Sequence, residues 1–316
     1  MQENFNKAKK LIDASQRILL TMHERMDGDD GGGILALAHH LKKAGKQITC
    51  AIKQGVPPYL KFLPGSETIQ DDITHADFDL VVMCGCSTKT RCGSQKILAL
   101  SAPTITIDHR PDNTNFGEVN LFDAGKSSVA ELIYDLFKFC RWPIGKETAV
   151  CLLTGIITDT GAFLHDNTKA ETLKAAAHLM NKGALTSKII RHTQKHKNPQ
   201  ILRAWGRAME NSYLDPKNKI IYAIIAENDL QELGELPQAA FEGFVSTLNT
   251  AAEANLALFV RQDGQVIKAS LRSEAHRNVD VSKIAKLFGG GGHKLAAGFS
   301  LIGKLVKDET GRWKAV

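Results

Sequence analysis

Residues 17–52 read RILLTMHERMDGDDGGGILALAHHLKKAGKQITCAI, and this stretch decides the fold. Residues 17–22 form an apolar run typical of a buried β-strand, and 47–52 form a second one. Between them, the apolar residues of 33–45 recur with the period of an α-helix. A strand, a helix and a strand in this order predict a βαβ unit, whose two strands lie parallel in one sheet.

The same alternation continues along the chain. LVVMC (80–84) and PTITI (103–107) are further strand-like runs, and a short helical stretch lies near 94–100. Helical periodicity then dominates from Ser127 to about Met180. We therefore predict an α/β fold in which residues 1–185 form a domain with a mostly parallel sheet and flanking helices.

The second half of the chain has a different pattern. Residues 186–200, TSKIIRHTQKHKNPQ, are basic and lose apolar periodicity, which predicts a linker that is partly helical. Residues 201–316 are expected to form a smaller α+β domain, in which Asp263-Gly264 signals a hairpin. The predicted elements of this part are a helix over 200–210, a strand over 219–226, a helix over 237–253 and strands over 254–262 and 265–273.

The composition is that of an ordinary folded protein, with 43% hydrophobic and 23% charged residues. The formal net charge of +6 suits an anionic substrate such as a nucleotide without establishing one. No apolar run approaches the roughly 20 residues that span a bilayer, and the start MQENFNKAKK lacks the apolar core of a signal peptide. The six cysteines show no spaced disulfide framework, so we expect a reducing, cytoplasmic setting and no membrane partner.

The first candidate site is MHERMDGDDGGG (22–33). His23, Asp27 and Asp29 follow directly on the first strand, and open α/β sheets bind ligands at the carboxyl ends of their strands. An imidazole and two carboxylates there are suitable ligands for Mn²⁺ or Mg²⁺. We interpret the glycines as tight turns before a helix whose N-terminus favours anions. The alternative is a flexible acidic turn with an aspartate as helix N-cap, which is the preferred interpretation for Asp30.

Two further segments contain side chains of the same kind. In TIDHRPDN (106–113), Asp108 is placed to orient the His109 ring by accepting its second N–H, although the segment also makes a simple turn. In LLTGIITDTGAF (152–163), Asp159 stands late in an apolar helix. A buried carboxylate there needs a partner, which is either a metal or a neighbouring hydroxyl or backbone N–H.

A glycine-rich segment, FGGGGHKLAAGF (288–299), lies in the second half of the chain. Its glycines predict a backbone loop that approaches phosphate closely, although most glycine loops are only flexible turns. The segment follows ASLRS, in which Arg272 is suited to a bidentate phosphate contact.

Together these segments resemble the DHH phosphoesterase family, and most closely its nano-RNase and pAp-phosphatase branch with a C-terminal DHH-associated domain. The resemblance covers nearly the whole chain, in the order HERMDGDD, VVMCGCSTKTR, IDHRPDN, GIITDTGAF, SLRS and GGGGHKLAAGF. It implies a two-domain hydrolase with two metal ions, usually Mn²⁺, that activate water and clamp the attacked phosphorus. It also implies a homodimer and a short oligonucleotide or nucleotide as substrate.

The resemblance implies roles for residues at matching positions. His23 and Asp27 would hold one metal, Asp29 and His109 the other, and Asp159 would complete the set. Asp108 and residue 110 would lie at the catalytic centre. The residues implied in holding substrate phosphates are Arg91, Arg272, Ser273, Gly290, Gly291, Gly292 and His293. Opening and closing of the linker would admit the substrate.

Two positions depart from the family pattern. The family has an aspartate that bridges both metals where this chain has Gly85, and a second histidine where it has Arg110. A register shifted by one residue would place Cys84 at the aspartate position, but the alignment on Gly85 is preferred. Three remaining carboxylates would carry −3 against +4 from two divalent ions, so metal affinity is expected to drop. Arg110 can pair with phosphate but cannot donate a proton at neutral pH. Cys84 and Cys86 flank the gap and could ligate a softer metal such as Zn²⁺, but two ordinary buried cysteines are the preferred interpretation.

Three functional hypotheses remain. The leading one is a metal-dependent phosphodiesterase or phosphatase for nanoRNA, linear dinucleotides and pAp, impaired by Gly85 and Arg110. The second is a catalytically silent nucleotide-binding protein in which Arg110 clamps phosphate. A cyclic-dinucleotide phosphodiesterase ranks lower. Long nucleic acid is not expected as a partner, because 191–197 is the only dense basic patch and no aromatic residues are interleaved with it.

Overall fold

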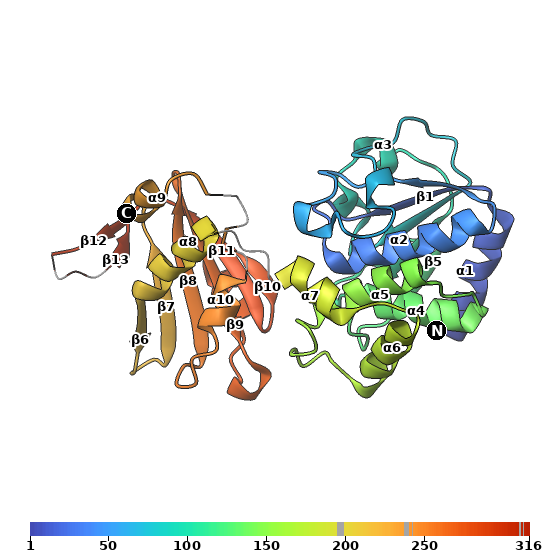
Figure 1. Cartoon of the computed structure of the whole chain (residues 1–316). Helices are drawn as coiled ribbons and strands as arrows, with labels where there is room; N and C mark the ends of the chain where they lie inside the picture. Colours follow the sequence, from blue (N-terminus) through green and yellow to red (C-terminus); the bar gives the residue numbers. More distant parts are fainter. Residues whose placement is uncertain (195–198, 237–239, 242, 310, 312) are drawn as a thin grey trace. The chain divides into compact units, whose positions relative to one another are not determined.

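The computed structural model describes every residue of the chain except 195–198, 237–239, 242, 310 and 312. The chain divides into two compact units, Met1–His196 and Lys197–Val316 (Figure 1). The predicted linker, 186–200, contains helix α7 (Thr186–Gln194), and its residues 195–198 lie outside the described part.

The first unit is built on a five-stranded sheet in the order β2-β1-β3-β4-β5, with every neighbouring pair parallel. Its strands are β1 (Arg17–Met22), β2 (Gln47–Cys50), β3 (Leu80–Cys84), β4 (Thr104–Asp108) and β5 (Val119–Phe122). Strands β3 and β4 are buried along their whole length, as expected for parallel strands that are covered on both faces. The predicted parallel α/β architecture is confirmed.

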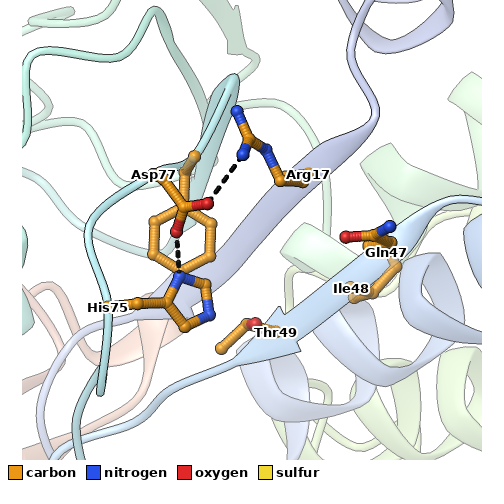
Figure 2. Close-up of a pocket in the computed structure, with 7 residues that line it drawn as sticks. Arg17, Gln47, Ile48, Thr49, His75 and Asp77 are labelled. Atoms are coloured by element: carbon orange, nitrogen blue, oxygen red, sulfur yellow. Dashed lines mark hydrogen bonds and ion pairs between the residues drawn. The ribbon is translucent and has the colours of Figure 1, made fainter.

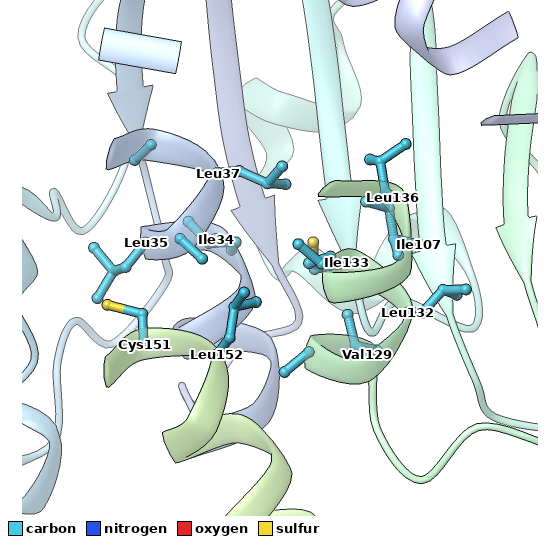
Figure 3. Close-up of a cluster of buried hydrophobic side chains, with 14 of the residues drawn as sticks. Ile34, Leu35, Leu37, Ile107, Val129, Leu132, Ile133, Leu136, Cys151 and Leu152 are labelled. Carbon is cyan, nitrogen blue, oxygen red and sulfur yellow. The ribbon is translucent and has the colours of Figure 1, made fainter. Parts of the chain in front are cut away.

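Helices complete the first unit: α1 (Gln2–Ala14), α2 (Gly28–Lys43), α3 (Gln95–Leu98), α4 (Val129–Cys140), α5 (Lys146–Asp159), α6 (Ala170–Asn181) and α7. Short 3₁₀ turns lie at Pro58–Leu60, Ser66–Thr68 and Lys89–Cys92. In the main core, Ile34 and Leu37 of α2, Ile133 of α4 and Leu152 of α5 pack with Ile107 of β4 (Figure 3). Burial of each such side chain contributes roughly 1.5–3 kcal/mol relative to an exposed one.

Helices α2 and α5 approach so closely that their backbones touch. A Cβ atom on Gly32 of α2 would overlap the carbonyl oxygen of Cys151 in α5. Helix α5 lies equally close to α4, because a Cβ atom on Gly155 would overlap the side chain of Ala130. The glycines of the first motif were expected to form turns, and this prediction is wrong, because Gly31 and Gly33 also lie inside helix α2. Close helix packing outweighs the low intrinsic helix propensity of glycine here.

The second unit has a mixed six-stranded sheet in the order β10-β11-β9-β8-β7-β6, in which β7 and β8 are parallel and the other pairs antiparallel. The strands are β6 (Ser212–Asp215), β7 (Ile220–Ile225), β8 (Leu256–Asp263), β9 (Val266–Ser273), β10 (Gly291–His293) and β11 (Ala296–Ile302). Strands β12 (Leu305–Lys307) and β13 (Trp313–Ala315) form a separate pair. The helices are α8 (Pro199–Glu210), α9 (Glu227–Leu233), α10 (Phe244–Leu248) and α11 (Val281–Leu287), with a 3₁₀ turn at Ala275–Arg277.

Of two predictions for the second unit, one is confirmed and one is wrong. The hairpin signal is confirmed, because Gly264 has a φ of +62° and Asp263 pairs with Val266. The long helix expected over 237–253 is wrong in its described part, where α10 has only five residues; residues 237–239 and 242 lie outside the described part.

Candidate metal centre

The turn after β1 positions the first group of polar side chains. Asp27 is the N-cap of α2, and its carboxylate accepts the backbone N–H of Asp30 at 2.9 Å. This cap places Asp29 and Asp30 in the first turn of the helix, where negative charge is favoured by the helix dipole. Three carboxylates are therefore gathered within four residues at the carboxyl end of β1.

The first donor group consists of His23, Asp27 and Asp30, whose ligand atoms lie within 4.8 Å of one another. His23 Nε2 lies 3.1 Å from Asp27 Oδ2 and 2.9 Å from Asp30 Oδ2. The other ring nitrogen of His23 lies 2.7 Å from the carbonyl oxygen of Glu24, which fixes the ring orientation.

The second donor group consists of Asp29, His109 and Asp159. His109 Nε2 lies 3.9 Å from Asp29 Oδ2 and 3.5 Å from Asp159 Oδ2. The Asp29 carboxylate accepts the backbone N–H groups of Val129 at 2.7 Å and Ala130 at 2.8 Å, at the start of α4. Strand β4 and the ends of helices α2 and α5 thus bring together residues that are far apart in the sequence.

Asp30 is the residue that the sequence interpretation missed. It was expected to act as a turn or capping residue, but Asp27 is the cap, and Asp30 is fully buried against His23. The glycine run had suggested a turn over this segment. Once the helix starts at Gly28 instead, residue 30 faces the same side as His23 and Asp27. The signal available in the sequence was Asp30 itself, a third aspartate directly after Asp27 and Asp29.

Three of the four carboxylates are held in an environment that disfavours their charged forms, and Asp27 is the exception: burial would raise its pKa, but the hydrogen bond with His23 lowers it. Burial, followed by repulsion from Asp159, raises the pKa of Asp29 well above its usual value. Burial and the charge of Asp27 raise the pKa of Asp30, and burial raises that of Asp159 to about 6. Burial would lower the pKa of His23, but its hydrogen bonds to Asp27 and Asp30 raise it to about 10. Such clustered shifts are typical of functional sites.

Gly85 and Arg110 lie beside the first donor group. Gly85 follows β3 with a φ of +59°, and its carbonyl oxygen accepts a hydrogen bond from Arg110 Nη1 at 2.6 Å. Arg110 Nη2 lies 3.5 Å from Asp30 Oδ2 and 3.8 Å from Asp27 Oδ2. Burial would lower the pKa of Arg110, but the charges of these carboxylates raise it, so the guanidinium stays charged.

Asp108 has a different hydrogen-bonding role from the expected one. Its carboxylate accepts the backbone N–H groups of His109 at 2.8 Å and Arg110 at 3.0 Å, and the Asn113 side chain at 2.6 Å. The His109 ring instead places Nδ1 3.2 Å from the carbonyl oxygen of Lys126. The predicted hydrogen bond from the ring to Asp108 is therefore wrong, and the Asp108 carboxylate instead shapes the loop by accepting hydrogen bonds from it.

The buried thiols of Cys84 and Cys86 lie outside both donor groups that the described residues form. Both cysteines are free, and burial raises their pKa values well above the usual one. Because neither thiol belongs to a group of suitable ligand atoms among the described residues, the interpretation as ordinary buried cysteines is favoured.

Two protein-family patterns match the chain. The pattern of the DHH family, N-terminal domain, matches residues 17–156, and that of the DHHA1 domain matches residues 217–310. The chain belongs to the DHH family. It is 28% identical over 288 residues, 90% of this chain and 84% of the relative, to the "Bifunctional oligoribonuclease and PAP phosphatase NrnA" of Thermus thermophilus.

Solved structures show the same fold. An exopolyphosphatase-related protein from Bacteroides fragilis is 25% identical and has a TM-score of 0.89, covering 96% of this chain and 92% of that chain. RecJ from Thermus thermophilus in complex with Mn²⁺ is 14% identical and has a TM-score of 0.54, covering 95% of this chain and 52% of that chain. None of the described helices of this DHH-family protein is long and apolar enough to cross a membrane.

The donor residues of this DHH-family chain fit the divalent metals on which DHH phosphoesterases depend. Each group offers one imidazole and two carboxylates, a ligand set that suits Mn²⁺. The Oδ1 atom of Asp30 is buried and has no hydrogen-bond partner in the described part of the chain. A buried charged oxygen without a partner is costly, and a cation would satisfy it.

The predicted substrate residues lie on both units. Arg91 is exposed in the 3₁₀ turn of the first unit, and its carbonyl oxygen accepts the Glu24 N–H at 2.8 Å. Arg272 lies on β9, opposite Ala296 of β11, and burial lowers its pKa. Ser273 is buried and donates to the carbonyl oxygen of Asn255 at 2.7 Å.

The glycine-rich segment forms a hairpin. Gly291, Gly292 and His293 make up β10, so the expected open loop is wrong for these residues. Cβ atoms on Gly290 and Gly292 would overlap the backbone of β11, which explains why glycine stands there. The side chain of His293 remains exposed at this edge of the sheet.

A pocket of about 470 Å³ lies at the opposite, amino-terminal end of the parallel strands (Figure 2). Arg17, Gln47 and Thr49 line it together with His75 and Asp77. Asp77 pairs with Arg17 Nη1 at 2.6 Å and with His75 Nδ1 at 2.6 Å. Since its charges are paired within the chain, this pocket has no feature that calls for a cation.

Proposed function

We propose that this protein is a two-metal phosphoesterase that hydrolyses short oligoribonucleotides, linear dinucleotides and pAp, with Mn²⁺ at both sites. The observation that carries the proposal is the pair of donor groups at the carboxyl edge of the parallel sheet. The activity named for the Thermus thermophilus relative and the Mn²⁺ named for RecJ support it. Mg²⁺ is the alternative metal.

The chain's own residues would act in three ways. His23 and Asp27 would hold one metal, and Asp29, His109 and Asp159 the other. When bound, the metals would lower the pKa of a water molecule and polarise the phosphoryl group. The Lys126 carbonyl and the helix α4 N–H groups would keep His109 and Asp29 oriented.

The remaining residues would contact the substrate. Arg110 would stabilise negative charge on the phosphate, since a guanidinium pairs with phosphate but does not donate its proton. On the second unit, Arg272, Ser273 and the β10 hairpin with His293 would bind further phosphates. Within this proposal, residues 1–185 and 201–316 form the two domains, 186–200 links them, and the protein is a cytoplasmic homodimer.

The experiment measures nucleoside monophosphate release from pApA, pGpG and pAp by purified protein with excess Mn²⁺, beside a chelator control. We expect turnover that the chelator abolishes, and none of a cyclic dinucleotide. The proposal fails if no substrate is hydrolysed and Gly85→Asp with Arg110→His, combined with Asp30→Ala to make room for the new side chain, restores nothing. Protein mass in solution, measured by light scattering, tests the homodimer.

A catalytically silent nucleotide-binding protein is the second candidate. It is favoured by Arg110, whose charged group lies between Gly85 and the carboxylates of the first donor group. A permanent cation there competes with a metal ion. Calorimetry distinguishes the two: nucleotide binding of equal affinity with and without Mn²⁺, in the absence of hydrolysis, would support the silent protein.

A further inference from the structure

We infer that Asp30 is a metal ligand that supplies, from helix α2, the carboxylate that the chain lacks at position 85 at the end of β3. The inference rests on the two-metal centre of the proposed function and assigns it one more ligand. Three observations carry it: the space that the Asp30 side chain fills, the state of its oxygens, and the charge of the site.

The first observation is spatial. A Cβ atom on Gly85 would overlap the carboxylate carbon and both oxygens of Asp30. The Asp30 carboxylate therefore occupies the volume in which any side chain of residue 85 would begin. A carboxylate at position 30 and a side chain at position 85 exclude each other in this arrangement, so the acidic residue and the glycine form a matched pair.

The second observation concerns the oxygens of Asp30. Its side chain is 1% exposed, and Oδ2 lies 2.9 Å from His23 Nε2. Oδ1 is buried without a hydrogen-bond partner among the described residues. A carboxylate that only capped a helix or paired with His23 would leave this oxygen unsatisfied, which is unfavourable for a buried charged group. A metal ion bound beside His23 and Asp27 would give Asp30 Oδ1 a partner.

The third observation is the charge balance. With Asp27, Asp29 and Asp159 alone, −3 would face +4 from two divalent ions, and Asp30 makes the carboxylate charge −4. The shortfall expected from Gly85 is thereby removed. Arg110 Nη1 donates to the Gly85 carbonyl oxygen, and its Nη2 lies 3.5 Å from Asp30 Oδ2 and 3.8 Å from Asp27 Oδ2. The guanidinium therefore shares these carboxylates with a cation that binds there, and the fourth carboxylate offsets part of its charge.

Mn²⁺ binding is the decisive measurement, because it does not depend on catalysis. Isothermal titration calorimetry and electron paramagnetic resonance would follow Mn²⁺ on the whole chain, on Asp30→Asn and on the exchanged variant Asp30→Ala with Gly85→Asp. We expect two Mn²⁺ per chain for the unaltered protein. Asp30→Asn should weaken one site by at least about 10-fold, and the exchanged variant should restore it.

Two controls separate ligation from structure. Glu131→Gln removes a different buried carboxylate, one whose oxygens have partners in Ser127, Thr172 and Lys126, and should leave Mn²⁺ binding unchanged. Gly85→Asp alone should lower the melting temperature without improving binding, because its side chain collides with Asp30. Asparagine at position 30 has nearly the shape of aspartate, so Asp30→Asn decides the question even if the exchanged variant does not fold.

The inference is overturned if Asp30→Asn binds two Mn²⁺ with unchanged affinity. It is also overturned if the folded exchanged variant binds no better than Asp30→Asn. If the unaltered protein binds no Mn²⁺, both this inference and the proposed metal centre are wrong. Two Mn²⁺ bound in the expected Asp30-dependent way, without hydrolysis of any substrate, would support the inference and overturn only the proposed function.

Discussion

The two ends of the parallel sheet carry the same kinds of charged residue in opposite electrostatic states. At the amino end, Asp79 accepts the backbone N–H groups of Arg17 and Gln16 and pairs with the Arg17 guanidinium, and these contacts lower its pKa to about 2. At the carboxyl end, burial and mutual repulsion raise the pKa values of Asp29 and Asp30.

This difference shows how a site can be recognised in the fold. The amino end has a pocket of about 470 Å³, and its charges are paired within the chain. At the carboxyl end, Asp27 and Asp30 also contact His23 and Arg110, but burial and repulsion still raise the pKa values of Asp29 and Asp30, and a buried oxygen of Asp30 has no hydrogen-bond partner among the described residues. Unfavourable electrostatics that a cation would relieve is a stronger sign of function than the volume of a pocket.

The largest expected effect is the difference in catalytic activity between a variant at the carboxyl end of the sheet and one at the amino end. Asp159→Asn removes one carboxylate of the second donor group and should lower kcat/KM for pApA by more than about 100-fold, because a metal and its bound water lose a ligand. Asp77→Asn, at the amino end, should stay within about twofold. Equal losses in the two variants would contradict the distinction between the two ends.

Metal binding should stabilise the carboxyl end specifically. At a free Mn²⁺ concentration 100 times the dissociation constant, one site adds about 2.7 kcal/mol to the free energy of unfolding. Differential scanning calorimetry with and without Mn²⁺ measures the shift in melting temperature. The shift should shrink in Asp159→Asn and persist in Asp77→Asn, and a shift of equal size in both would mean that Mn²⁺ binds elsewhere.

The smallest effect is a pH dependence of opposite sign at the two ends, measured on metal-free protein. Asp159 has a raised pKa of about 6, so its ionisation destabilises the fold and stability rises as pH falls from 6 to 4. His23, raised to about 10, contributes stability below pH 6.5 that is lost as pH rises towards 10. Asp79, lowered to about 2, contributes stability above pH 4 that is lost towards pH 2.

Melting temperatures from pH 2 to pH 9 would test these signs. We expect a maximum at about pH 4 for the unaltered, metal-free protein, with a fall on either side. Asp159→Asn should flatten the curve between pH 4 and pH 6, and Asp79→Asn should flatten it between pH 2 and pH 4. A melting temperature that rises steadily from pH 5 to pH 9 would contradict the raised pKa values of Asp159 and His23 at the carboxyl end.

Much of the first unit could be predicted from its sequence. Short apolar runs such as 17–22 and 80–84, separated by helical stretches, are sufficient to indicate a parallel sheet. Because the carboxyl ends of parallel strands share one edge, the sequence is enough to expect that His23 and His109 lie near each other. The structure brings together both sets of expected donors, and their roles as metal ligands remain a proposal.

The parts that could not be predicted depend on contacts between distant segments. The glycines at 31–33 favour a turn by their local propensity, and only the approach of Cys151 in α5 shows that they belong to a helix. The position of Asp30 follows from that helix and was missed for the same reason. Likewise, nothing local predicts that the Lys126 carbonyl group, 17 residues away, contacts the His109 ring instead of Asp108.

The cysteines on either side of Gly85 have a practical consequence for kinetics. Cys84 and Cys86 are buried, and their raised pKa values keep the thiols protonated and unreactive while the fold is closed. A thiol reagent can reach them only when the carboxyl edge opens transiently, so their labelling rate reports how often it does. The labelling rate of Cys84 and Cys86 therefore measures local opening beside the proposed metal centre, and bound Mn²⁺ should lower it.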